Sequence, residues 1–257
     1  MIRSMFLIVA VISLNACAGI DSLDQPPKMI SAGIWDSEHF RKAHPDLVHR
    51  LEGQRHYEDG EYEQALTEFT QSANFGDKLA QAMIAEIHWE GHGVSVDRSL
   101  AYAWMDLAAE RGFVAFVAKR ERYWQALGAA ERVRALELGV SLYDAYGDQV
   151  ALARMQGKLK RGLYGSLAAR PGMGGGRGMV ILPGSGGSVG VAAGVPGAAP
   201  FVTGGVQMEF GAYYAREFWR LDQYVAWHAE HLDLARRGIV EVGPVKSVED
   251  PTGPESL

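Results

Sequence analysis

Three side chains in the second half of the chain follow the order of a hydrolytic triad. Residues 186–190 match the G-x-S-x-G pattern of a nucleophile elbow around Ser188, and Asp222 and His228 follow as candidate acid and base. Such an elbow works only as a strained turn between a strand and a helix of an α/β sheet. No alternation of strands and helices surrounds Ser188, and a stretch this rich in glycine produces the match by chance. We therefore expect no catalytic serine here.

Two histidine pairs have spacings that suit a shared metal ion. His228 and His231 lie three residues apart on a predicted helix, and His88 and His92 flank a predicted turn. The first pair matches neither the H-E-x-x-H metalloprotease motif nor the deaminase motif with its cysteines. We interpret both pairs as ordinary surface or interfacial histidines. Acidic residues near the first helices are interpreted as solvated charges: Glu38, Glu58, Asp59, Glu61 and Glu63. The sequence thus predicts no catalytic residue, no metal site and no cofactor.

The amino-acid composition excludes several further classes of protein and site. The 257 residues are 47% apolar and 22% charged, which is enough apolar material for a folded core. Lys and Arg number 25 against 31 Asp and Glu, so the chain lacks the basic surface of a nucleic-acid-binding protein. A single cysteine excludes an internal disulfide, a CxxC redox pair and a thiolate zinc cluster.

The N-terminal residues have the pattern of a secretion signal. Arg3 precedes an apolar run of ten residues, 5–14. A helix of that length covers about half of a hydrocarbon layer roughly 30 Å thick, so the run predicts a signal peptide and not a membrane span. Ordinary secretion, with cleavage near Ala16 or Ala18, is one interpretation of it.

The four residues 14–17, Leu-Asn-Ala-Cys, resemble the lipobox of bacterial lipoproteins. The resemblance implies that residues 1–16 are a lipoprotein signal peptide, that Cys17 is lipidated, and that residues 17–37 are a tether. Acyl chains anchor a protein strongly, at about 0.8 kcal/mol for each buried methylene group. Ala18 after the cysteine favours, by the same resemblance, the outer membrane of a Gram-negative cell. The expected location is the cell envelope, facing the periplasm.

An internal repeat occupies the first half of the chain. His-Tyr-Glu at 56–58 recurs as His-Trp-Glu at 88–90, an offset of 32. Four further positions recur at an offset of 36, after an insertion in the turn at 91–96: Ala65 and Ala101, Phe69 and Met105, Ala73 and Ala109, and Gly76 and Gly112. Apolar residues three or four apart predict a helix, a turn and a helix in each unit. Asp97 is expected to cap the second helix of its unit.

Residues 91–112 resemble a Sel1-like repeat, a relative of the tetratricopeptide repeat. The match is Gly-x-Gly-Val-x-x-Asp-x-x-x-Ala-x-x-Trp-x-x-x-Ala-Ala-x-x-Gly. Residues 47–76 resemble a more degenerate unit, closer to the tetratricopeptide form. The resemblance implies an all-α fold, a short α-solenoid of helical hairpins over residues 38–165. A third hairpin over 114–126 and 129–146 and a capping helix to about residue 163 complete the prediction, with a break at Gly147 and Asp148.

The second half of the chain has a different composition. Residues 166–208 are rich in glycine and predict a flexible segment. Residues 209–237 predict one C-terminal helix whose aromatic residues dock on the repeat domain. Residues 238–257 are expected to be an extended tail, with a short extended segment at 239–242.

The predicted function is non-enzymatic. In stacked helical hairpins the first helices line the concave side, and four residues recur there at the 32-residue offset: Gln54, Tyr57, Glu86 and Trp89. Polar and aromatic pairs suit recognition of a protein or peptide partner. The alternative that Tyr57 and Trp89 pack between repeats stays open.

We therefore expect a protein–protein interaction adaptor or scaffold, bound to the membrane through its lipid anchor and not to nucleic acid. The other hypotheses are an envelope hydrolase with a Sel1-like repeat fold and an accessory structural component of a secretion system.

Overall fold

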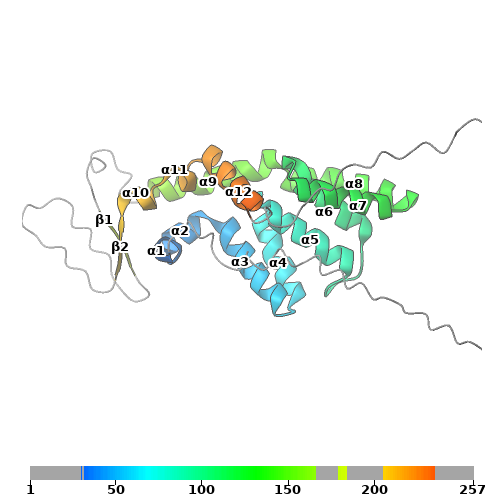
Figure 1. Ribbon diagram of the computed structural model, residues 1–257, viewed down its shortest axis with the longest axis horizontal. Helices are drawn as coiled ribbons and strands as arrows, with labels where there is room; N and C mark the ends of the chain where they lie inside the picture. The colour runs from blue at the N-terminus through cyan, green and yellow to red at the C-terminus, as the bar shows by residue number, and fades with distance from the viewer. Residues whose placement is uncertain (1–29, 31, 166–178, 184–204, 235–257) are drawn as a thin grey trace, which may run out of the picture.

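The computed structural model describes residues 30, 32–165, 179–183 and 205–234, and these residues form an all-α fold with one small two-stranded sheet (Figure 1). The helices of the first two thirds are α1 (Ala32–Trp35), α2 (Glu38–Ala43), α3 (Pro45–Glu58), α4 (Tyr62–Ala73), α5 (Lys78–Glu90), α6 (Arg98–Ala108), α7 (Val114–Ala126), α8 (Ala129–Tyr146) and α9 (Asp148–Gly165). A 3₁₀ turn, Ala109–Arg111, extends α6. The later elements are β1 (Met179–Pro183), β2 (Gly205–Glu209), α10 (Phe210–Tyr213), α11 (Arg216–Trp219) and α12 (Leu221–Leu234).

Two helical hairpins, α3–α4 and α5–α6, confirm the predicted repeat. Gly60 follows α3 and Gly91 follows α5, and both adopt the left-handed conformation, with φ of 77° and 74°. Asp97 caps α6 as expected, since its carboxylate accepts a hydrogen bond from the Leu100 amide. Each first helix is therefore followed by a left-handed glycine, although Gly91 lies one position earlier in its unit than Gly60. The hairpins stack into a short α-solenoid.

Small residues let the helices of the solenoid approach closely. Ala80, Ala101 and Ala108 are fully buried in the first hydrophobic core. Gly53 of α3 lies so close to Phe69 of α4 that a Cβ atom at this position would stand 2.7 Å from the ring. The close approach is the physical reason for small side chains at these crossings.

The third helical pair departs from the hairpin geometry. The predicted break at Gly147 is confirmed, because Gly147 adopts an extended conformation between α8 and α9. However, α7 and α8 both pack on α6, and α9 runs on to pack against α2, α11 and α12. The helix that follows the break, α9, thus connects the solenoid to helices near the beginning and at the end of the part of the chain that the structure describes.

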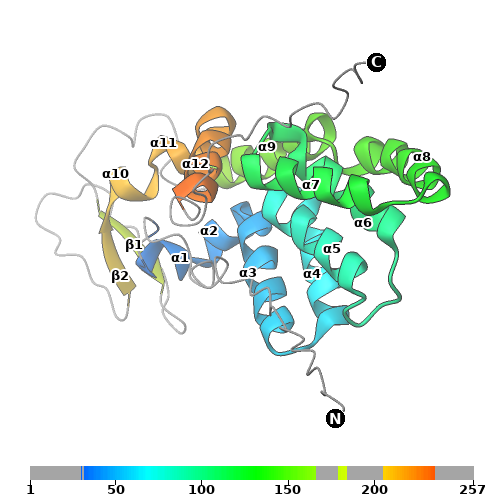
Figure 2. The ribbon, with the colours of Figure 1, turned by 45° about the vertical axis from the view of Figure 1, so that its right-hand side comes forward.

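A second hydrophobic core joins the two ends of the described chain. It combines residues of α1, α2, α3 and α9 with residues of α10, α11 and α12, and Figure 2 shows how these helices lie. Its fully buried side chains include Phe40, Leu47, Met155, Leu159 and Tyr213. Ile34 of α1 is buried here, so the end of the predicted tether at 17–37 belongs to the folded unit.

The prediction of one helix over residues 209–237 is wrong. The chain instead forms α10, α11 and α12, with Arg220 in an extended conformation between the last two. Because of these breaks, the side chains of Tyr213, Phe218 and Trp219 all point into the second core. The Trp219 indole donates a hydrogen bond to the Tyr213 carbonyl at 2.7 Å. A single straight helix would distribute these rings over several faces.

Part of the glycine-rich segment also has regular structure. β1 and β2 pair antiparallel, from Met179 opposite Glu209 to Pro183 opposite Gly205. The rest of residues 166–208 and the predicted tail at 238–257 lie outside the described residues. No described helix combines the length and the apolar composition that a membrane span requires.

Candidate functional site

The two aromatic residues predicted to bind a partner both contact neighbouring helices. The Tyr57 hydroxyl lies 3.0 Å from Nδ1 of His92, and its ring meets Tyr62 edge to face. The Trp89 indole stacks on Tyr123, with ring centroids 3.7 Å apart. Both rings are partly buried against the first core, so they contribute to packing between repeats.

Of the two polar residues of that prediction, Glu86 has partners within the chain and Gln54 is buried. Glu86 accepts a hydrogen bond from the Tyr123 hydroxyl at 2.9 Å and forms an ion pair with Lys119. Gln54 is buried, and its Oε1 atom has no hydrogen-bond partner among the described residues. Tyr123 thus contacts both Glu86 and Trp89 from α7.

The structure describes two residues of the rejected triad, Asp222 and His228, and these two have different partners. Ser188 lies outside the described residues, as does the predicted lipidation site, Cys17. Asp222 is exposed and forms an ion pair with Arg220, whereas His228 is buried and meets Asp46. The side chain of His231 is not among those described. His228 therefore belongs to a different group of residues from the one that the sequence suggested.

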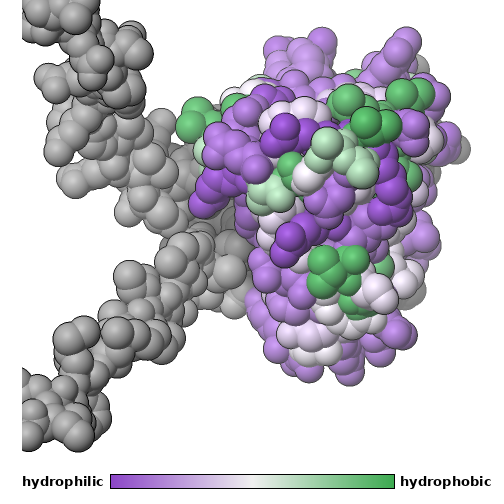
Figure 3. Space-filling view, turned by 90° about the vertical axis from the view of Figure 1, so that its right-hand side faces the viewer, coloured by the Kyte–Doolittle hydropathy of each residue, from purple (hydrophilic) through white to green (hydrophobic). Residues whose placement is uncertain are grey.

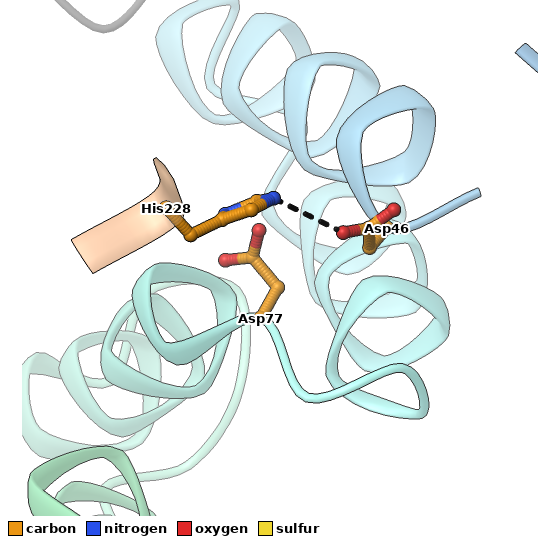
Figure 4. A group of neighbouring side chains, drawn as sticks. All are labelled: Asp46, Asp77 and His228. Carbon is orange, nitrogen blue, oxygen red and sulfur yellow. Dashed lines mark ion pairs between the residues drawn. The ribbon is translucent and has the colours of Figure 1, made fainter. Parts of the chain in front are cut away.

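A buried polar cluster of Asp46, Asp77 and His228 lies where the C-terminal helix meets the repeats (Figure 4). Asp46 stands in the first turn of α3, Asp77 caps the N-terminus of α5, and His228 projects from α12. One ligand atom from each residue lies within 4.8 Å of the other two. Three elements far apart in the sequence thus bring two carboxylates and an imidazole together.

Each carboxylate of the cluster has identified partners. Oδ2 of Asp46 accepts a hydrogen bond from the Tyr224 hydroxyl at 2.7 Å and lies 3.4 Å from Nε2 of His228. Oδ2 of Asp77 accepts from Arg50 at 2.8 Å, and its Oδ1 accepts from the Ala80 amide at 2.9 Å. Asp46 Oδ1 has no hydrogen-bond partner among the described residues.

Among the three residues of the cluster, Asp46 has a strongly shifted pKa. Burial, with the charge of Asp77 beside it, raises the pKa of Asp46 to about 7, although Tyr224 and Arg50 both stabilise its ionised form. Burial and the neighbouring Asp46 likewise raise the pKa of Tyr224 well above its ordinary value. A small cavity of about 10 Å³, comparable to the space that one water needs, is lined by all three cluster residues.

A second buried histidine, His44, holds α11 in place. Both ring nitrogens of His44 meet carbonyl oxygens, Nδ1 that of Phe40 at 2.8 Å and Nε2 that of Phe218 at 2.7 Å. Burial outweighs these two contacts and lowers the pKa of His44 to about 4. His44 therefore docks α11 on the N-terminal helices beside the polar cluster.

The sequence did not reveal this cluster, because its residues are up to 182 positions apart and no motif links them. One signal was present in the repeat itself. Asp46 and Lys78 are equivalent at the 32-residue offset, and both are buried charged groups in the first turn of a helix. A buried charge at a repeated position marks a place where a partner group must come from elsewhere.

The surface of α8 carries an exposed apolar row. Val133, Leu136 and Val140 are 59%, 59% and 66% exposed. They stand at positions i, i+3 and i+7 of the helix and so lie on one face. Figure 3 views the end of the molecule at which α7 and α8 lie, where hydrophobic side chains gather in patches between hydrophilic ones. We call these three residues the α8 row.

Comparisons with known proteins give one structural similarity. No protein-family model matches the chain, and no curated protein matches it. Among solved structures, the chain is similar to c5321, a protective antigen present in uropathogenic Escherichia coli strains that displays an SLR (Sel1-like repeat) fold. The two are 26% identical over 44% of this chain and 25% of that one, with a TM-score of 0.37, so the similar region spans a quarter of that protein's length.

Proposed function

We propose that this protein is a non-enzymatic adaptor that binds a helix of a partner protein and is held at the bacterial cell envelope by a lipid on Cys17. The observation that carries the adaptor function is the α8 row at the end of a stack of helices. Helical solenoids bury their apolar faces by stacking each unit on the next. The α8 row is an apolar face that the described elements of this chain leave more than half exposed.

The spacing of the row identifies the occupant as a helix. Val133, Leu136 and Val140 alternate by three and four residues, which is the seam that one helix presents to another in a coiled coil. The row extends over about 10 Å along α8, or two turns. An amphipathic helix from a partner would bury these side chains in the same way as the helices of the solenoid bury theirs.

The charged variant Leu136→Glu tests the row. We expect photo-crosslinkers placed at positions 136 and 140 in cells to capture one defined partner, and Leu136→Glu to weaken binding of that purified partner at least tenfold, because a carboxylate would be buried at the seam. The matched control is Val114→Glu on α7, where the valine is 73% exposed outside the row.

Two results would contradict this placement. Equal binding by Leu136→Glu and the wild type would exclude the α8 row as the interface. Loss of binding in Glu86→Gln together with full binding in Leu136→Glu would place the interface on the predicted concave side, with Gln54, Tyr57 and Trp89.

The lipid anchor is supported by the lipobox-like residues and has its own test. Cys17→Ser removes the only thiol of the chain, so we expect this variant to leave the membrane fraction for the soluble fraction. Sedimentation of Cys17→Ser with membranes at the level of the wild type would refute the anchor while leaving the adaptor function open.

A further inference from the structure

We infer that Asp46, Asp77 and His228 bind a divalent transition-metal ion of the zinc class, which fastens the C-terminal helix to the first two repeats. The sequence predicted no such site. The inference does not depend on the adaptor function proposed above.

The ligand types select the class of metal. Two carboxylate oxygens and one imidazole nitrogen suit Zn²⁺ and its neighbours in the first transition row, whereas Mg²⁺ and Ca²⁺ favour sites built from oxygen alone. All three side chains are more than nine-tenths buried. They come from three helices, which is typical of a site that organises tertiary structure.

The distance between Asp46 and His228 fits two ligands of one ion. Zinc bonds to nitrogen and oxygen are about 2.0–2.1 Å long, so two tetrahedral ligands stand about 3.4 Å apart. Asp46 Oδ2 and His228 Nε2 are 3.4 Å apart, which is long for a hydrogen bond. An oxygen of Asp77 lies within 4.8 Å of both atoms, so this carboxylate would have to rotate to become the third ligand.

The state of the Asp46 carboxylate also supports a bound cation. Its side chain is 2% exposed, yet Oδ1 lacks a hydrogen-bond partner among the described residues. A buried acceptor left in this state destabilises the fold, and more so when it is charged. A cation bound at this carboxylate would compensate for that cost.

The surroundings supply the remaining groups that a metal site needs. Tyr224 and Arg50 hydrogen-bond to the two carboxylates and would orient them, as groups around bound metals do. The adjoining cavity has about the volume that one water needs, and a water bound there would serve as a fourth ligand. A dication, two carboxylates and Arg50 sum to one positive charge, and a proton lost from the bound water would bring this sum to zero.

Metal binding to the full chain tests the inference. The Cys17→Ser form, stripped of metal with a chelator, excludes binding by the thiol. We expect one Zn²⁺ to bind per chain by calorimetry and elemental analysis, and the melting temperature to rise on addition of Zn²⁺. Co²⁺ in place of Zn²⁺ should show the visible absorption of tetrahedral coordination.

Variants assign the site. His228→Gln and Asp46→Asn should each weaken Zn²⁺ binding at least a hundredfold, because each removes one of three protein ligands. The matched control is His49→Gln, since His49 also pairs with a carboxylate, Glu68, at 2.7 Å but lies outside the cluster. Circular dichroism without metal shows whether each variant keeps its helices.

The inference is overturned if folded wild-type protein binds no Zn²⁺ at micromolar concentration. That result would identify the cluster as a closed set of ion pairs, Arg50 with Asp77 and His228 with Asp46. Undiminished binding by folded His228→Gln and Asp46→Asn would also overturn it. If both variants fail to fold, the Co²⁺ spectrum of the wild type tests the inference instead. A spectrum of octahedral coordination, with no tetrahedral absorption, would contradict the site.

Discussion

Replacing Lys78 with alanine is expected to lower the free energy of unfolding by about 3–5 kcal/mol. The Lys78 side chain is fully buried at the start of α5, and its ammonium donates to the carboxylate of Glu110 at 2.7 Å and to the carbonyl of Leu107 at 3.1 Å. It also forms an ion pair with Asp148 at 3.0 Å. The alanine variant would leave the carboxylates of Glu110 and Asp148 and the Leu107 carbonyl around a cavity, without the positive charge that they now share.

Urea denaturation of the full chain measures this loss. The matched control is Lys42→Ala, because Lys42 also forms an ion pair, with Glu38, but on an exposed surface where such a pair contributes about 1 kcal/mol or less. Lys78→Met should lose less than Lys78→Ala, since it fills the space. A change below 1 kcal/mol in Lys78→Ala would show that the buried network does not stabilise the fold.

The same network predicts the direction of an acid effect. Although burial opposes it, the hydrogen bond and charge of Arg111, with those of Lys78, hold the pKa of Asp148 below its usual range. A lowered pKa in the folded state gives stability that is present above the unfolded value and is lost as the pH falls below it. Lys78→Ala should therefore lose less stability on acidification, below about pH 4, than the wild type.

Replacing Phe69 with alanine is expected to cost about 3–5 kcal/mol of unfolding free energy. Phe69 is fully buried between α3 and α4, and its ring faces Gly53. The truncated side chain would leave a cavity that the stacked helices cannot close without moving. Val114→Ala, at an exposed position, should stay within about 0.5 kcal/mol of the wild type.

A double-mutant cycle makes this prediction specific to the crossing. Gly53→Ala should destabilise the wild type by about 1–3 kcal/mol, because the added methyl group would overlap the Phe69 ring. In the Phe69→Ala background the same change should be nearly neutral, because the ring is absent. Equal effects of Gly53→Ala in both backgrounds would refute the contact.

The repeats could be predicted from sequence because their signals are local. Gly60 and Gly91 supply the left-handed residue after each first helix, and Asp97 supplies a cap. These features act within a few residues of their positions in the chain. Periodicity also predicted correctly a helix at residues 129–146, where α8 carries Val133, Leu136 and Val140 on one face. It could not show that this face would be left exposed.

The polar cluster and the C-terminal fold depend on contacts over long distances in the sequence. Tyr224 meets Asp46 across 178 positions, and no periodic pattern reports such a pair. The apolar spacing of residues 209–237 suits a helix, but packing of Tyr213, Phe218 and Trp219 into one core breaks it. Tertiary contacts thus override local preference where the two ends of the chain meet.

The second core, built from both ends of the described chain, sets an order for biosynthesis. A ribosome adds about 5–20 residues per second, so the 178 residues that separate Asp46 from Tyr224 take on the order of ten seconds or more to emerge. During that interval Phe40 and Leu47 lack the aromatic residues that later cover them. The second core therefore cannot close around Phe40 and Leu47 before α11 and α12 have been synthesised.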